Sequence, residues 1–392
     1  MYPTLSDLLR DLFGINFPLP VQSFGFMLAI SFLAAAYTLK MELKRKEAGG
    51  LLRIVKRQVM QGEPAKPAEL LSSFLIGFFL GFKLVYAFMH YSAFVEDTQK
   101  VLLSWDGNWP AGFIIGGIMA YMQYREKEKA RLNPPQLVTE QLHPFELVSN
   151  FTIVAAVSGI IGAKLFHNLE NLDDFARDPI DALVSFSGLT MYGGLILGTI
   201  AVMRYGHKMG VPPMVLADAT APGLMLAYGT GRLGCQISGD GDWGIVNLQP
   251  KPDWLSWLPD WAWAYNYPNN VVNDGIPIPG CTGHHCFMLP DAVYPTPLYE
   301  AVMCILLFVV LWSLRGKLVK TGQVFFLYLM LNGSERFFIE KIRVNNKFEF
   351  LGIIATQAEI IAVCLVITGA IGLWLAGKDK FKIKPYASTA SH

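Results

Sequence analysis

The sequence predicts an all-α polytopic membrane protein with about nine transmembrane helices. Of its 392 residues, 53% are hydrophobic and only 16% are charged, a composition too apolar for a soluble globular protein. Several apolar runs are long enough to cross a hydrocarbon core about 30 Å thick. We predict spans at 19–39, 70–91, 110–124, 148–168, 188–204, 214–235, 297–314, 322–340 and 355–376.

The segments between these spans differ strongly in basic residues. With the N-terminus outside, the inside segments hold 21 of the 32 Lys and Arg residues, and the outside segments hold seven. Basic residues are retained on the cytoplasmic side, so we expect an outside N-terminus and a cytoplasmic C-terminus. The N-terminal residues lack a basic region followed by an apolar core and a cleavage site, so we expect the first span to stay in the protein.

Two pairs of spans resemble each other, which predicts an internal duplication in parallel orientation. In each pair Gly-x-Lys closes the first helix and Gly-Gly opens the second. The positions are Gly81 and Lys83 with Gly116 and Gly117, and then Gly162 and Lys164 with Gly193 and Gly194. Chance similarity between glycine-rich membrane helices is the alternative. A parallel repeat also lacks the inverted symmetry common in secondary transporters.

The longest outside segment, 237–296, is predicted to form a head outside the membrane. It is rich in proline and asparagine and contains five tryptophans, Trp243, Trp254, Trp257, Trp261 and Trp263. Tryptophan favours the lipid interface, where its ring is buried and its N–H stays hydrated. We therefore expect most of these rings to rest at the membrane surface.

Cys281 and Cys286 lie in the motif CTGHHC within this head. In an oxidising compartment two close cysteines favour a disulfide. A metal site that also uses His284 and His285 is the alternative.

The sixth span ends in a glycine-rich stretch that carries an arginine, GTGRLGCQISGDGDWG, with Arg232 near its start. An arginine inside hydrocarbon costs about 2.5–3.5 kcal/mol, so it is expected to face protein or water and to meet an anion. Gly229, Gly231 and Gly234 leave backbone N–H groups open beside it. This pattern predicts a phospholipid headgroup site, and an arginine that anchors a helix end at the interface is the alternative.

Arg336 lies at a similar depth near the outer end of the eighth span. Because both spans run from inside to outside, the two guanidiniums are expected to converge on one phosphodiester, with Glu300 and Glu340 holding them in place. The alternative is a buried Arg–Glu network that only fixes helix register. That structural role is the better interpretation for two further carboxylates, Asp218 and Glu335.

Together these motifs resemble the prolipoprotein diacylglyceryl transferase family. The matching motifs are YGGLILG from Tyr192, DATAPGLMLAYGTGRLG, SGDGDWG, YPTPLYE ending at Glu300 and ERFFIEKIR from Glu335. The resemblance covers about 18–40 and 145–376. It leaves out about 45–140, which we attribute to an inserted, duplicated helix pair added to a family core of seven spans.

The resemblance implies a bacterial inner-membrane transferase with a periplasmic N-terminus and head and a cytoplasmic C-terminus. Members of the family move the diacylglyceryl group of phosphatidylglycerol to the thiol of the lipobox cysteine in a preprolipoprotein signal peptide, forming a thioether and releasing glycerol 1-phosphate. The implied partners are therefore phosphatidylglycerol, that signal peptide and membrane lipid. Nucleic acid, metals and diffusible cofactors are not expected in the reaction.

Carried over by motif, the resemblance also implies a set of site residues. The expected catalytic residues are Arg232, Arg336, Tyr192, Glu300 and Glu340. The expected substrate-binding residues are Arg232, Arg336, Gly193, Gly194, Gly231, Gly234, Ser238 and Gly244. In this scheme Tyr192 takes the thiol proton, directly or through water, although an ordinary tyrosine pKa near about 10 requires nearby cations for that role.

Four positions depart from the family's pattern. Tyr192 stands where many members have the histidine of HGG, Cys235 replaces an asparagine, Phe24 replaces a tyrosine, and Asn332 replaces another tyrosine. These changes weaken the assignment of any one general base. They also leave two rivals, a catalytically degenerate relative that binds anionic lipid or signal peptides, and a transporter.

The predicted organisation has six segments along the chain. They are the N-terminal segment with the first span, 1–40; the cytoplasmic basic segment with the inserted helix pair, 41–144; core spans with the GTGRLG motif, 145–236; the periplasmic head, 237–296; further core spans, 297–376; and a cytoplasmic tail, 377–392.

Overall fold

The computed structural model describes residues 1–15, 19, 21–96, 101–102, 104–184, 190–345, 347–350 and 353–383. The chain divides into two compact units. We call the first the core unit, which contains Met1, Phe24–Val55 and the chain from Leu142 onward. The second is the hairpin unit, Tyr2–Ser23 with Lys56–Gln141. Positions 384–392 of the predicted tail lie outside the described residues.

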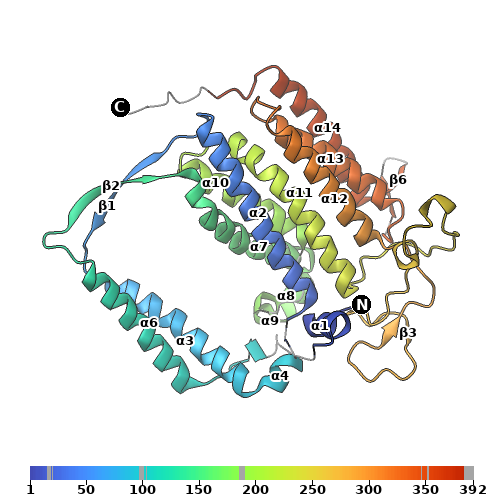
Figure 1. Cartoon of the computed structure of the whole chain (residues 1–392), viewed down its shortest axis with the longest axis horizontal. Helices are drawn as coiled ribbons and strands as arrows, with labels where there is room; N and C mark the ends of the chain where they lie inside the picture. The colour runs from blue at the N-terminus through green and yellow to red at the C-terminus, as the bar shows by residue number, and fades with distance from the viewer. Residues whose placement is uncertain are drawn as a thin grey trace. The chain divides into compact units, whose positions relative to one another are not determined.

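Each predicted span overlaps a long helix of the described chain, and residues 20, 188 and 189 of the predicted spans lie outside the described residues. These helices are α2 (Ser23–Ala48), α3 (Pro67–Met89), α6 (Trp109–Lys129), α7 (Val148–Glu170), α10 (Met191–Lys208), α11 (Pro213–Ser238), α12 (Thr296–Leu314), α13 (Gln323–Glu340) and α14 (Gln357–Gly377) (Figure 1). Shorter helices are α1 (Leu5–Phe13), α4 (Tyr91–Glu96), α8 (Leu172–Arg177) and α9 (Pro179–Val184), with 3₁₀ turns at Pro144–Leu147, Asp253–Leu255 and Asp260–Ala262.

Within the described residues, five helices are long and apolar enough to cross a membrane. They are α2, α3, the continuous helix Pro144–Glu170 that contains α7, α12 and α14. The mostly helical, polytopic membrane architecture is therefore confirmed. Among the described residues, the other four long helices, α6, α10, α11 and α13, do not meet this criterion of length and apolarity.

Helix α11 lies at the centre of the core unit, where it packs against α10, α12 and α13. It also contacts α2, because a Cβ atom on Gly223 would lie 2.5 Å from the Thr38 hydroxyl. A buried apolar cluster joins α2, α7 and α11 through Leu43, Phe151 and Leu216. This close packing holds the first half of α11 against α2 and α7.

The ends of these helices follow their sequence signals. Helix α11 begins with proline in its first turn and ends at Gly239, whose φ of 66° is a left-handed conformation that favours glycine. Helix α12 also has proline in its first turn. Helix α14 begins with a capping box, in which the Glu359 backbone N–H donates to the Thr356 hydroxyl and the Thr356 backbone N–H donates to the Glu359 carboxylate.

Two helical hairpins, α3–α6 and α7–α10, close in the same way. A Cβ atom on Gly81 would lie 2.5 Å from the Ala111 carbonyl oxygen, and one on Gly162 would lie 2.4 Å from the Gly193 carbonyl oxygen. Each second helix is preceded by a residue whose backbone N–H reaches back to the first helix. Asn108 donates to Phe82 at 2.9 Å, and Thr190 donates to Ala163 at 3.1 Å.

These matched contacts support the internal duplication but correct its register. They make Ala111 and Gly112 equivalent to Gly193 and Gly194, whereas the sequence comparison paired Gly116 and Gly117 with that dipeptide. The helix-crossing point, which requires close backbone approach, determines the equivalence better than the presence of two adjacent glycines.

The head, which follows α11, has a small buried cluster of Tyr267, Leu289 and Val293. Its two short strands, β3 (Ile276–Pro277) and β4 (Phe287–Met288), pair antiparallel. A disulfide joins Cys281 and Cys286, which confirms the favoured prediction for CTGHHC.

The five tryptophans of the head divide into two groups. Trp254, Trp257 and Trp261 are exposed. Trp243 instead packs against Tyr267, with ring centroids 5.0 Å apart, and the indole N–H of Trp263 donates to the Gln249 carbonyl. Three rings are therefore exposed and the other two pack within the head, and the position at a lipid interface stays a prediction.

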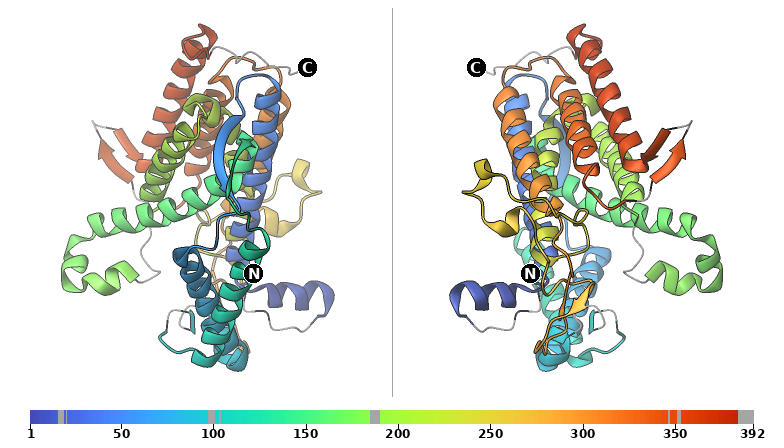
Figure 2. Two further views of the ribbon diagram at one scale, coloured as in Figure 1. Left: turned by 90° about the vertical axis from the view of Figure 1, so that its left-hand side faces the viewer. Right: turned by 90° about the vertical axis from the view of Figure 1, so that its right-hand side faces the viewer.

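Two further strand pairs complete the described structure. Strands β5 (Lys347–Phe350) and β6 (Ile353–Thr356) pair antiparallel, with Lys347 opposite Thr356. Figure 2 shows this pair projecting beside α13 and α14. In the hairpin unit, β1 (Val55–Gln61) and β2 (Gln136–Leu142) form a two-stranded sheet.

Candidate functional site

Three arginines and three carboxylates meet where α11, α12 and α13 reach the head. We call this set the arginine cluster, and it consists of Arg232, Arg336, Arg343, Glu300, Glu340 and Asp242. Helix α11 supplies Arg232, α12 supplies Glu300, and α13 supplies Arg336 and Glu340. The structure therefore brings together four of the predicted catalytic residues.

Glu300 lies at the centre of the cluster. Its side chain is fully buried, and its Oε1 lies 3.1 Å from Nη1 of Arg336 and 3.2 Å from Nη1 of Arg343. Its Oε2 pairs with Nε of Arg232. A buried carboxylate is tolerated only when charge partners compensate for its lost hydration, so the three guanidiniums and Glu300 hold one another in place.

Arg336 is held by a second carboxylate on its own helix. Its Nη2 lies 3.1 Å from Oε2 of Glu340, one helical turn further along α13. Glu340 in turn accepts a hydrogen bond from the Asn345 side chain at 2.5 Å. Arg232 also lies over the Tyr228 ring, with 5.3 Å between its Cζ and the ring centroid.

Asp242 and Arg343 belong to the cluster although sequence reasoning did not select them. The Asp242 carboxylate bridges Arg232 and Arg343 with one oxygen on each guanidinium. Burial favours the neutral form of Asp242, but the two guanidiniums outweigh it and lower its pKa below the usual range. Both residues lie inside motifs that carry the family resemblance, SGDGDWG and ERFFIEKIR. Those motifs were the sequence signal that could have identified them.

Gly244 explains how these two residues meet. Its backbone N–H donates to the Tyr294 carbonyl at 2.9 Å, and the next residue, Ile245, donates to the Ile342 carbonyl at 2.9 Å. A Cβ atom on Gly244 would lie 2.5 Å from the Ile342 oxygen. Only glycine permits this approach, which places the loop carrying Asp242 against the segment carrying Arg343.

The predicted substrate-binding residues of α11 contact neighbouring helix atoms. A Cβ on Gly234 would lie 3.0 Å from Met27 of α2, and one on Gly231 would lie 3.8 Å from the Ser31 hydroxyl. The Ser238 hydroxyl donates to the Gly234 carbonyl at 2.9 Å. These contacts orient α11, and direct contact with substrate stays a prediction for all three residues.

Tyr192, Gly193 and Gly194 lie at the start of α10, away from the bonded cluster. Both glycines pack against α7, since a Cβ on Gly194 would lie 2.9 Å from the Gly159 oxygen. Across the described part of the chain, no hydrogen bond or ion pair joins Tyr192 to the arginine cluster. The role of Tyr192 as proton acceptor therefore stays a prediction.

The two carboxylates expected to be structural differ from each other. Asp218 accepts hydrogen bonds from the backbone N–H groups of Gly322 and Phe325 at 2.7 and 2.9 Å, and Lys46 lies 3.7 Å away. It thus binds α13 to α11, as predicted. Glu335 is 4% exposed, and neither of its oxygens has a hydrogen-bond partner among the described residues.

Cys235, Asp240 and Asp242 present their Sγ and carboxylate oxygens within 4.8 Å of one another. This spacing would suit a cation, but Asp242 is already bound to two guanidiniums whose charge opposes one. Burial also raises the pKa of Asp240, which favours its neutral form. We therefore assign no metal to this group.

A family model described as prolipoprotein diacylglyceryl transferase matches residues 109–375, more than half of the chain. The chain belongs to this family. Membership in the prolipoprotein diacylglyceryl transferase family makes the protein a transferase. The match begins at Trp109, the first residue of α6, so the sequence-based boundary near 145 was placed too late.

Curated relatives agree with this assignment. The phosphatidylglycerol–prolipoprotein diacylglyceryl transferase of Corynebacterium diphtheriae is 32% identical over 239 residues, which is 60% of this chain and 80% of the relative. The enzyme of the same name from Bifidobacterium adolescentis is 31% identical over 222 residues, 53% of this chain and 60% of the relative. The one from Streptococcus mutans is 26% identical over 268 residues, 67% of this chain and 88% of the relative.

Proposed function

We propose that this protein transfers the diacylglyceryl group of phosphatidylglycerol to the lipobox cysteine thiol of a preprolipoprotein and releases glycerol 1-phosphate. The related enzymes are named for phosphatidylglycerol and a prolipoprotein, which supply the lipid and the acceptor of this proposal. The observation that carries the proposal is the convergence of Arg232 and Arg336 on Glu300 from separate helices. It brings two guanidiniums, which bind phosphate oxygens, to one point, as a phosphate-handling reaction requires.

The proposed reaction is a displacement at carbon. The cysteine sulfur forms a bond to the glyceryl carbon that carries the phosphate, and the bond between that carbon and the phosphate oxygen breaks. The electron pair leaves with the phosphate oxygen, and the thiol proton passes to a base. Guanidinium groups bind phosphate oxygens in a planar, bidentate manner, so Arg232 and Arg336 would stabilise the departing charge.

We assign supporting roles to the other members of the site. Glu300 and Glu340 hold the guanidiniums in position, and Gly244 holds the loop after α11 against the end of α13. Gly193, Gly194, Gly231, Gly234 and Ser238 complete the proposed binding region through the helix contacts described above. Tyr192 is the proposed proton acceptor, and a Tyr192→Phe variant with unchanged turnover would remove it.

The proposed placement is the bacterial inner membrane with all nine long helices crossing. This topology puts the N-terminus and the head of 237–296 in the periplasm and the C-terminal tail in the cytoplasm. The excess of basic residues in the inside segments supports it. The preprolipoprotein signal peptide would then meet the arginine cluster on the periplasmic side.

The proposal is tested by mass spectrometry of a lipobox peptide incubated with purified protein and phosphatidylglycerol. We expect a diacylglyceryl mass gain on cysteine with release of glycerol phosphate, and a loss of at least about 100-fold in rate for Arg232→Ala and for Arg336→Ala. Arg45→Ala is the matched control, because Arg45 pairs with Glu42 near the other end of the helices. It should keep its turnover.

Folded wild-type protein that retains phosphatidylglycerol but forms no product would contradict the proposal. That result would instead favour the degenerate lipid-binding relative.

A further inference from the structure

The arginine cluster is already balanced in charge without a substrate. Its three guanidiniums are paired with three carboxylates, Glu300, Glu340 and Asp242. A phosphodiester can form bidentate bonds only with guanidinium N–H groups that are not bound to another anion. Each guanidinium already has two of its three nitrogens in contact with a carboxylate, so a phosphate that binds any one of them through two nitrogens competes with a carboxylate for at least one nitrogen.

The three carboxylates differ in how firmly they are held. The side chains of Glu300 and Glu340 are fully buried, and both belong to helices. Asp242 is 32% exposed and lies in the loop after α11. A partly hydrated carboxylate loses less on leaving its partners than a buried one does, because water replaces the lost contacts. Asp242 is the carboxylate that an incoming anion can displace.

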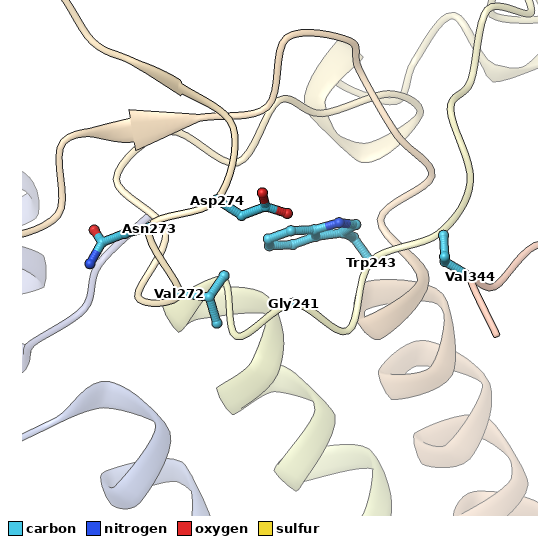
Figure 3. Close-up of a pocket in the computed structure, with 6 residues that line it drawn as sticks. All are labelled: Gly241, Trp243, Val272, Asn273, Asp274 and Val344. Atoms are coloured by element: carbon cyan, nitrogen blue, oxygen red, sulfur yellow. The ribbon is translucent and has the colours of Figure 1, made fainter. Parts of the chain in front are cut away.

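Asp242 also has space beside it. Its neighbours in the chain, Gly241 and Trp243, line a pocket of about 530 Å³. Val344, which follows Arg343, lies at the edge of the same pocket, and Figure 3 shows Asp274 pointing toward the Trp243 indole. The Thr296 hydroxyl donates to the Asp242 backbone carbonyl at 2.8 Å, which holds the backbone in place independently of the carboxylate.

We propose that Asp242 holds the position of the substrate phosphate, bridging Arg232 and Arg343 until the phosphate of phosphatidylglycerol displaces it. This inference rests on the proposed function and adds the location of the phosphate and a group that controls its exchange. One monoanion replaces another, so the net charge of the cluster is unchanged. Arg343 becomes a phosphate-binding residue beside Arg232 and Arg336.

The same exchange accounts for product release. The leaving group is a phosphate monoester, which carries about −1.5 to −2 charges near pH 7 and would bind two guanidiniums more tightly than the diester does. Because Asp242 stays attached to the neighbouring loop, it competes for the guanidiniums at a high effective concentration. When the Asp242 carboxylate binds the guanidiniums again, it displaces glycerol 1-phosphate and so prevents the product from staying bound.

The test measures binding of glycerol 1-phosphate by calorimetry, together with separate kcat and KM values for phosphatidylglycerol. In Asp242→Asn we expect glycerol 1-phosphate to bind about tenfold more tightly, with a lower KM, because one charge-assisted competitor is gone. A lower kcat is also expected, since product leaves more slowly. Asp260→Asn is the matched control, because it removes a carboxylate that pairs with Lys251 and has no ion pair with the arginine cluster.

Asp242→Ser provides a second variant that also removes the charge. If neither Asp242 variant binds glycerol 1-phosphate more tightly than wild type, or if Asp260→Asn gains as much, the inference is wrong. A purely structural role for Asp242 would weaken binding and raise KM. Wild-type protein that neither binds the probe nor forms product would contradict the proposed function itself, so the two failures are distinguishable.

Discussion

The two ends of α11 both bury charged groups, but they do so in different ways. Near its first turn, Asp218 and Lys46 are 1% and 6% exposed, and Asp218 is also bound by two backbone N–H groups of the α13 start. Near its last turn, three guanidiniums share Glu300, and two of them also share a partly exposed Asp242 whose chain neighbours line a pocket. Burial of charge alone therefore does not identify a site. Sharing of charge and access for a ligand distinguish the two ends.

The largest effect is expected from breaking the centre of the arginine cluster. In Glu300→Gln the three guanidiniums lose their common partner and repel one another, so turnover should fall by at least about 100-fold and stability by about 3 kcal/mol. Turnover per folded molecule and thermal unfolding measure the two effects. Glu42→Gln, a buried carboxylate paired with Arg45 and Arg315, should lose stability while keeping its turnover. Equal loss of turnover in both variants would show that the arginine cluster does not differ in function from a buried ion pair elsewhere in the protein.

A second substitution tests the opposite end directly. Asp218→Ala leaves Lys46 without its partner and the Gly322 and Phe325 N–H groups unsatisfied, so we expect a loss of about 3 kcal/mol in unfolding free energy. The KM for phosphatidylglycerol of the protein that remains folded should be unchanged. A raised KM at normal stability would show that Asp218 belongs to the substrate site.

The smallest effect is a pH dependence of the Asp242 bridge. The guanidiniums lower the pKa of Asp242 in the folded protein, so its contribution to stability is complete above about pH 4, the value for an unfolded aspartate. The contribution disappears as the pH falls through the lowered folded pKa. The difference in thermal stability between wild type and Asp242→Asn should therefore shrink below about pH 4. A difference that grows with acidification would contradict this sign.

The sequence predicted the helices and four of the six members of the cluster for identifiable reasons. Apolar runs located the spans, and the shared direction of two spans brought Arg232 and Arg336 to one depth. Asp242 and Arg343 were not predicted as site residues because they lie in loops. The path of these loops depends on the backbone contact between Gly244 and Ile342. Periodicity carries no information about such a path.

The two similar hairpins, α3–α6 and α7–α10, can be compared with each other position by position. The matched closing contacts make Asn108 equivalent to Thr190, so Pro110 occupies the place that Tyr192 has in the second copy. Proline suits the first turn of a helix but has no titratable group. The two copies therefore share a scaffold while only one presents a phenol, a pattern expected when one member of a tandem repeat keeps an ancestral task and the other is free to change.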